Sequence, residues 1–161
     1  MMSQWTNGIA RITLPTPFPV GDVNVFLIKG ERLTLVDAGT NTDIAWNSFV
    51  KQLNELHLSP NDIEQIIITH HHPDHVGLLA YFPETVEVYG HPLNQPWLTI
   101  SESFIKTNED FFVRTLAEFG VVDSFLALKN EFRRTTKYSC ERTLTGHLRE
   151  GIRHLAYQSG R

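Results

Sequence analysis

A cluster of histidines directly after a β-branched segment constrains this chain more than any other feature. Residues 69–75 read Thr-His-His-His-Pro-Asp-His, and Ile66, Ile67 and Ile68 come immediately before them. A continuous β-branched run of this kind is typical of a strand buried on both faces. In α/β proteins, ligand sites lie beyond the carboxyl ends of such strands. The cluster is therefore expected at a functional edge of a sheet.

The residue types and their spacing in the cluster favour a metal site. His70 and His72 are two residues apart, so in an extended segment both rings point to the same side. Pro73 bends the chain, which places Asp74 and His75 toward a second ion or the open side of the first. Imidazole and carboxylate groups bind zinc, iron or manganese. The alternative is an exposed, tag-like histidine run, but tags sit at termini and lack the interposed Pro-Asp.

Strand and helix patterns alternate along the rest of the chain, which predicts an α/β fold. A hairpin turn at residues 29–32 separates two β-like runs. Thr42 or Asn41 is suited to cap a helix that continues to Leu56. The expected strands cover residues 23–28, 33–36, 66–68 and 86–89, and a second long helix covers residues 101–119, with Phe112, Val113, Leu116 and Phe119 on one face and Gly120 as its C-cap.

Size and composition limit the protein's class. A chain of 161 residues with 41% hydrophobic and 20% charged residues fits one globular domain over residues 1–161. No apolar run approaches the roughly 20 residues of a membrane span, and residues 1–19 lack a signal-peptide pattern. With one cysteine, Cys140, a cytoplasmic location is expected. A net charge of −4 gives no reason to expect nucleic acid or a membrane as a partner.

The motif Thr69-His70-His71-His72-Pro73-Asp74-His75 resembles the T-H-x-H-x-D-H signature of metallo-β-lactamase-fold hydrolases. Residues 24–28 and 35–39 resemble the paired opening strands and aspartate turn of that superfamily. The likeness covers about residues 8–120. It implies an αββα sandwich, of which this chain holds the N-terminal half. Members include β-lactamases, thioester hydrolases, lactonases and nucleases.

The resemblance also implies roles for single residues. His70 and His72 would bind a first zinc ion, and Asp74 and His75 a second, with iron or manganese as alternatives. Asp74 would also act in catalysis by orienting or deprotonating the attacking water. His71 would point away from the metals. Asp37 is interpreted either as a carboxylate that supports the ligands from beneath or as a simple turn aspartate.

The resemblance leaves the C-terminal part of the chain unexplained. A full member needs a third histidine, a bridging aspartate and a final histidine. Gly146-His147 resembles the turn that carries the third histidine, but Leu148 to Gly151 equally resembles the polar turn that precedes it, which would leave His147 an exposed loop residue. Residues 121–161 hold eight Lys and Arg against four Asp and Glu. This segment is interpreted as an atypical basic C-terminus on a truncated domain.

Three functions remain open from the sequence. The first is a zinc hydrolase that uses a metal-bound hydroxide on the carbonyl of an ester, thioester, lactone or lactam in a small-molecule substrate. The second is a metal-binding fragment that lacks the full ligand set. The third is a metallo-nuclease or phosphodiesterase, favoured mildly by the basic stretch Lys129, Arg133, Arg134, Lys137 and Arg142. A half-sandwich would expose an apolar sheet face, which makes a homodimer an additional expectation.

Overall fold

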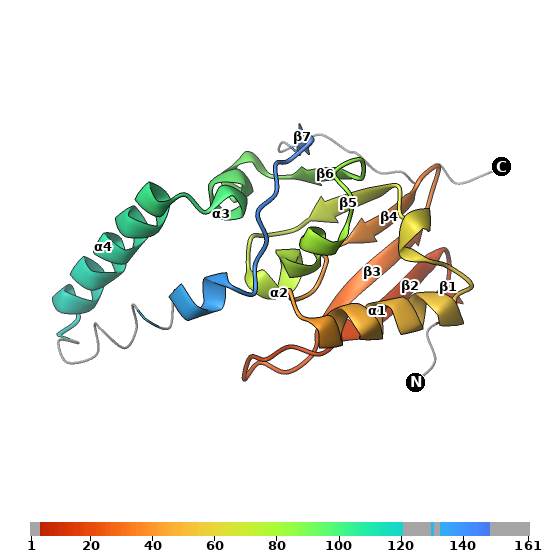
Figure 1. Ribbon diagram of the computed structural model, residues 1–161, viewed down its shortest axis with the longest axis horizontal. Coiled ribbons are helices and arrows are strands. Elements are labelled where there is room, and N and C mark those ends of the chain that lie inside the picture. The colour runs from red at the N-terminus through yellow and green to blue at the C-terminus, as the bar shows by residue number, and fades with distance from the viewer. Residues whose placement is uncertain (1–3, 121–129, 131–132, 149–161) are drawn as a thin grey trace.

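A single seven-stranded mixed sheet organises the molecule (Figure 1). The computed structural model describes residues 4–120, 130 and 133–148. The strands follow one another across the sheet in chain order, antiparallel from β1 to β4 and parallel from β4 to β7. They are β1 (Trp5–Thr6), β2 (Ile9–Leu14), β3 (Val23–Lys29), β4 (Leu33–Val36), β5 (Gln65–Ile68), β6 (Glu87–Gly90) and β7 (Gly146–His147).

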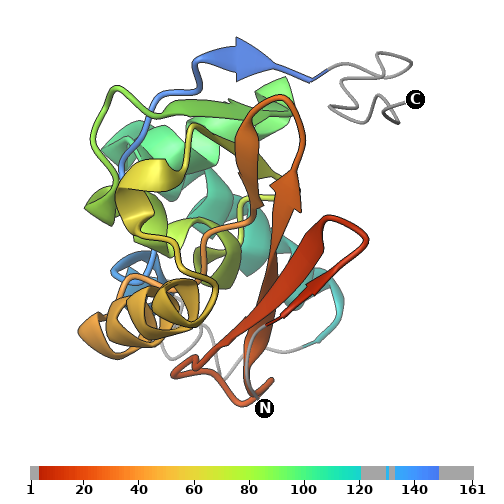
Figure 2. The same cartoon turned by 90° about the vertical axis from the view of Figure 1, so that its right-hand side faces the viewer.

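Helices cover one face of this sheet. The α-helices are α1 (Asp43–Glu55), α2 (Pro73–Val76), α3 (Gln95–Thr99) and α4 (Glu102–Glu118), and the 3-10 helices are η1 (Pro60–Asp62), η2 (Gly77–Tyr81) and η3 (Pro92–Asn94). Helices α1 and α2 lie on the same side of the strands (Figures 1 and 2). Alternate residues of the strands point toward them and are fully buried, including Ile12, Val25, Leu27 and Ile66. The core is therefore one α layer packed on one β layer.

Local sequence signals explain where the main elements begin and end. The Thr42 side chain accepts a hydrogen bond from the backbone N–H of Ala45, which confirms it as the cap of α1. Gly120 has a φ of +74°, the left-handed conformation expected of a residue that ends a helix such as α4. The hairpin between β3 and β4 is also confirmed, because Lys29 pairs with Leu33. These local predictions depend on neighbouring residues only.

One burial prediction from the sequence is wrong, and one apolar helix face lies outside the core. Strand β5 alternates instead of being buried on both faces: Ile66 and Ile68 are buried, whereas Ile67 is only half-buried. The apolar face of α4 does not pack into the core, since Phe112 and Phe119 are 46% and 78% exposed. Helix α4 instead extends away from the sheet (Figure 1). The pattern identified the helix, but a periodic apolar face does not say what it packs against.

The face of the sheet opposite α1 carries an apolar row. Phe26 pairs with Val36, Val36 with Ile67, and Ile67 with Tyr89, so these side chains follow one another across four strands. Phe26 is 39% exposed. Ile67 lies in this row, on the face without α1, and is therefore not fully buried.

No helix within the described residues is long and apolar enough to cross a bilayer.

Candidate metal centre

The candidate site lies where two neighbouring parallel strands end. Strand β4 ends at Val36 and β5 at Ile68, and their carboxyl ends meet at one edge because the strands run parallel. Asp37 follows β4 directly, and its N–H donates to the carbonyl of Ile67 at 2.9 Å. Asp37 has a φ of +60°, a left-handed conformation that aspartate tolerates better than most residues. The turn holds its carboxylate beneath the histidine cluster.

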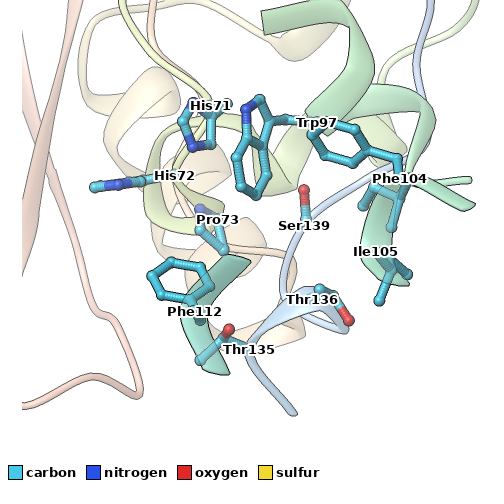
Figure 3. Close-up of a pocket in the computed structure, with 11 residues that line it drawn as sticks. His71, His72, Pro73, Trp97, Phe104, Ile105, Phe112, Thr135, Thr136 and Ser139 are labelled. Atoms are coloured by element: carbon cyan, nitrogen blue, oxygen red, sulfur yellow. The ribbon is translucent and has the colours of Figure 1, made fainter. Parts of the chain in front are cut away.

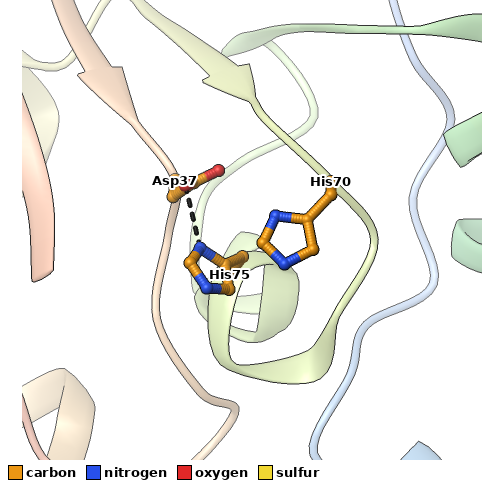
Figure 4. Close-up of side chains that lie close together, drawn as sticks. All are labelled: Asp37, His70 and His75. Atoms are coloured by element: carbon orange, nitrogen blue, oxygen red, sulfur yellow. Dashed lines mark hydrogen bonds and ion pairs between the residues drawn. The ribbon is translucent and has the colours of Figure 1, made fainter. Parts of the chain in front are cut away.

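The carboxylate of Asp37 organises this edge of the sheet (Figure 4). Its Oδ2 lies 2.8 Å from Nδ1 of His75. The backbone N–H of Thr69 donates to Oδ1 at 2.8 Å, and the Thr69 hydroxyl lies 3.0 and 2.8 Å from the two oxygens. Asp37 is only 6% exposed, so these contacts replace water around a buried charge. The geometry supports the role of a carboxylate that orients ligands over that of a simple turn residue.

Thr69 links the same carboxylate to a second histidine. Its Oγ1 lies 3.0 Å from Nδ1 of His70. A hydroxyl that donates its one proton to Asp37 can accept one from His70 Nδ1–H. His75 Nδ1–H donates to Asp37 directly. In this arrangement both rings carry their proton on Nδ1, which leaves both Nε2 atoms with a lone pair for a metal.

The structure groups two of the four predicted ligands, His70 and His75, with Asp37, and His72 and Asp74 each lie next to one of these histidines. One potential ligand atom from each of Asp37, His70 and His75 lies within 4.8 Å of the others. The ring centroids of His70 and His72 are 4.6 Å apart. Asp74 Oδ2 lies 3.5 Å from His75 Nε2. Three imidazoles and two carboxylates at this partly exposed edge of the sheet are a donor set that suits a divalent transition metal, so the residues fit the implied cofactor.

Helix α2 sets the positions of the last three motif residues. His72 is the residue before the helix, with an extended backbone, and Pro73 opens the first turn. The carbonyl of His75 accepts a hydrogen bond from the N–H of Ala38 at 2.7 Å, which ties the helix to the turn after β4. The proline and the short helix thus fold Asp74 and His75 back over Asp37.

The histidine pKa values differ with their surroundings. Burial, and then the charges of His75 and His72, lower the pKa of His70. For His75, burial would also lower the pKa, but the hydrogen bond and charge of Asp37 and the charge of Asp74 outweigh it and raise the pKa. A metal competes with protons for these nitrogens. The lowered pKa of His70 therefore favours the neutral ring that a metal needs.

Two other histidines lie apart from the ligand group. His71 stacks on Trp97, with ring centroids 4.1 Å apart and an interplanar angle of 11°, and burial first, then the charges of His72 and His70, lower its pKa to about 4. His147 pairs with Gly90 at the end of β7, two strands from β5, roughly 10 Å at the usual strand spacing. The structure does not bring His147 into the group formed by Asp37, His70 and His75. Its role as a ligand stays a prediction.

Sequence reasoning missed Thr69 as a part of the site. Thr69 was named only as the first residue of the motif and was given no role, whereas its hydroxyl connects Asp37 and His70. A signal for its role was present in the sequence. The run of three isoleucines is followed by Thr69, whose hydroxyl can form hydrogen bonds directly before the histidines. That Thr69 lies beside Asp37 follows from the pairing of β4 with β5, which only the three-dimensional structure shows.

Comparisons with known proteins agree with this geometry. The sequence profile described as the metallo-beta-lactamase superfamily matches residues 18–104. The chain is 42% identical over 147 residues to the probable metallo-hydrolase YqjP of Bacillus subtilis, covering 91% of this chain and 46% of that protein. It is 38% identical over 76 residues to the metallo-beta-lactamase fold-containing protein ST1585 of Sulfurisphaera tokodaii, covering 47% of this chain and 24% of that protein.

Solved structures show the same fold. The metallo-beta-lactamase family protein TTHA1429 of Thermus thermophilus superposes with a TM-score of 0.74 at 25% identity, covering 91% of this chain and 48% of that one. The present chain thus spans about half the length of YqjP and of TTHA1429. Its sheet and helix layer are the N-terminal half of the shared fold. With the matched profile, the strand-end histidine motif and the fold in agreement, the chain belongs to the metallo-beta-lactamase superfamily.

Proposed function

We propose that this chain forms the metal-binding half of a zinc-dependent hydrolase that acts on the carbonyl of an ester, thioester or lactone. The observation that carries the proposal is the Asp37 carboxylate, which holds His75 directly and His70 through Thr69. Such a second layer of hydrogen bonds is typical of histidines that bind metals. An incidental run of histidines would have no need of it.

The proposal gives each side chain of the motif a separate task. His70 and His72 are the ligands of a first ion, and Asp74 and His75 those of a second. Asp74 lies beside His75 and is 18% exposed at its side chain, so its carboxylate is placed to hold an attacking water and to accept its proton. A bound divalent metal supplies a polarised carbonyl and a water of lowered pKa. Zinc suits this mixture of imidazole and carboxylate donors, and iron or manganese are the alternatives.

The basic residues of the C-terminal stretch support a carbonyl substrate over a phosphodiester. Arg133 binds the carboxylates of Glu109 and Glu102. Arg142 donates to the carbonyls of Phe82, Pro83 and Val86 at 2.7–3.0 Å. Both guanidinium groups are thus already paired with acceptors of the protein, although Arg133 is exposed. Lys129 lies outside the described residues.

Metal content per chain tests the proposal. Elemental analysis would compare the native chain with His72→Ala and Asp74→Ala, and with His57→Asn as the control. His57 is an exposed histidine in a left-handed conformation that asparagine also tolerates. We expect zinc to fall in both motif variants and to stay unchanged in His57→Asn. Metal bound equally by all four proteins would refute the site.

Hydrolysis assays then separate the candidate activities. A panel of one thioester, one lactone, one aryl ester and one phosphodiester would be tested with the zinc-loaded chain. Turnover of a carbonyl substrate that Asp74→Ala loses supports the proposed hydrolase. Stoichiometric zinc without turnover favours a metal-binding fragment, and turnover of the phosphodiester alone favours a nuclease.

The homodimer and the cytoplasmic location stay predictions. The apolar row Phe26, Val36, Ile67 and Tyr89 supports an association through the sheet face. Sedimentation at micromolar concentration checks it, and a monodisperse monomer would contradict it.

A further inference from the structure

An apolar pocket opens directly beside the metal-binding histidines (Figure 3). It has a volume of about 270 Å³, close to the lower end, roughly 300 Å³, of small-molecule sites. Its walls come from four places: residues 71–73 of the motif, α3 with the residue that follows it, residues of α4 as far as Phe112, and residues 135–139. His72 belongs both to this wall and to the ligand group. A substrate held at the metal site would therefore extend into this pocket.

Aromatic rings form the part of the wall nearest to the motif. Trp97 lies flat against His71, and Phe104 meets Trp97 edge-on, with centroids 4.8 Å apart and an angle of 89°. This arrangement fixes the orientation of both rings. Ile100, the first of two residues between α3 and α4, has a φ of +43°, which is rare for a β-branched side chain. That turn directs α4 so that Phe104 faces Trp97, and strained backbone of this kind is concentrated at ligand sites.

The chemistry of the wall selects against charge. Among the described residues that line the pocket, none is Lys, Arg, Asp or Glu. The nearby Arg133 is bound to Glu109 and does not line the pocket. A carboxylate or phosphate on a ligand would lose its water here without gaining a partner from Lys or Arg. The pocket therefore suits an uncharged group.

One polar atom in the wall lacks a partner within the described part of the chain. Ser139 lines the pocket and is only 6% exposed, and its hydroxyl has no hydrogen-bond partner there. Figure 3 shows its oxygen pointing toward the rings of Trp97 and Phe104. A buried polar group without a partner costs about 1–3 kcal/mol. A hydroxyl so placed is suited to a single hydrogen-bonding atom on a ligand.

We infer that this pocket binds an uncharged aromatic group of the substrate, and that Ser139 pairs with one polar atom on that group. The inference rests on the proposed function, because it assigns the pocket to the non-reacting part of the substrate. It narrows the substrate class to esters, thioesters or lactones with an apolar, ring-bearing substituent. Phe104 and Trp97 would select the ring.

Binding of an unreactive ketone tests the inference without hydrolysis. Calorimetry would compare 4-phenyl-2-butanone with the same ketone carrying a carboxylate on the far carbon of its ring. We expect the uncharged ketone to bind at least tenfold more tightly, and Phe104→Ala to weaken it about tenfold. Phe111→Ala is the matched control, since Phe111 lies on the same helix, is exposed and does not line the pocket. Equal effects of the two variants, or no preference for the uncharged ring, would overturn the inference.

A hydroxylated ring isolates the role of Ser139. We expect 4-(4-hydroxyphenyl)-2-butanone to bind severalfold more tightly than the unsubstituted ketone in the native chain, and no such gain in Ser139→Ala. A gain that persists in Ser139→Ala would show that the serine is not the partner. Ketone binding that depends on Phe104, without turnover of any ester, would overturn the proposed hydrolase alone. Turnover of a small acetate ester without ketone binding would overturn the pocket inference alone.

Discussion

Oδ2 of Asp37 lies 2.8 Å from Nδ1 of His75, although the two residues are 38 positions apart in the chain. The pairing of β4 with β5 brings them together, and helix α2 returns His75 over the turn. Because the same carboxylate holds Thr69, one buried charge sets the orientation of two candidate ligands. These hydrogen bonds restrict the rotation of both rings, which reduces the entropy lost when a ligand binds.

The first prediction concerns this carboxylate. Asp37→Asn keeps the size of the side chain and tolerates the left-handed backbone, but it removes the charge that polarises His75. We expect zinc affinity to fall about 10- to 100-fold, the usual effect of losing an outer partner of a ligand. Competition with a chromophoric chelator measures it. Asp22→Asn, in an exposed loop, is the control, and an affinity of Asp37→Asn within threefold of the native value would contradict the prediction.

The second prediction concerns a close approach of three chain segments at Gly77. A Cβ at this position would overlap backbone atoms of Thr40, Asn41 and Tyr138. Backbone atoms cannot rotate aside, so Gly77→Ala should lower the free energy of unfolding by about 1–3 kcal/mol or more. Urea denaturation measures the loss.

A matched glycine supplies the control for this substitution. At Gly90 the nearest atom to a new Cβ is Nδ2 of the Asn94 side chain, at 3.3 Å, and a side chain can move. Gly90→Ala is expected to cost less than Gly77→Ala. The reverse order would mean that the backbone contacts at Gly77 are not tight in solution.

Features that depend on neighbouring residues could be predicted from the sequence. Thr42, Gly120 and the hairpin at residues 29–32 act through neighbours in the chain, and each was predicted correctly. The histidine motif also identified the superfamily, since ligand spacing is a local property. Strand β2 was missed, because its residues alternate beside a proline-rich segment that reads as irregular.

The part that could not be predicted depends on contacts between distant segments. Nothing in the spacing of Trp97, Ser139 and the histidines shows that they border one pocket. Glu109 is buried on α4 and paired with Arg133, although Phe111, Phe112 and Phe119 of the same region are exposed. A sequence pattern describes one element's periodicity, whereas burial depends on which segment lies opposite.

The third prediction concerns that ion pair. Arg133 and Glu102 are both largely exposed, whereas the Glu109 side chain is 3% exposed. Arg133→Ala would leave the buried carboxylate without its main partner, and such a charge is costly. We expect the backbone amides of α4 to exchange hydrogen at least tenfold faster in this variant, measured by mass spectrometry. Glu102→Gln removes only the exposed contact and should change exchange little. Equal exchange in both variants would contradict the role given to Glu109.

The fourth prediction concerns the buried thiol of Cys140. In the sequence, Cys140 follows the helical residues 133–136 and precedes β7. Burial raises its pKa from 9.0 to about 12, against a small lowering by the charge of Arg142. The thiolate is the reactive form, so a disulfide reagent at pH 8 should modify the native chain at least tenfold more slowly than the chain in denaturant. Rapid modification of the native chain would show that the segment opens readily.

The same thiol gives a dependence of stability on pH with a definite sign. Because the pKa is higher in the folded chain, the unfolded chain loses the proton first as the pH rises above about 9. The stabilising contribution of Cys140 is therefore complete below pH 9 and is lost progressively toward pH 12. Urea denaturation at pH 8 and pH 10.5 should show a larger fall in the free energy of unfolding for the native chain than for Cys140→Ala. Parallel falls in the two proteins would assign the alkaline loss to other groups.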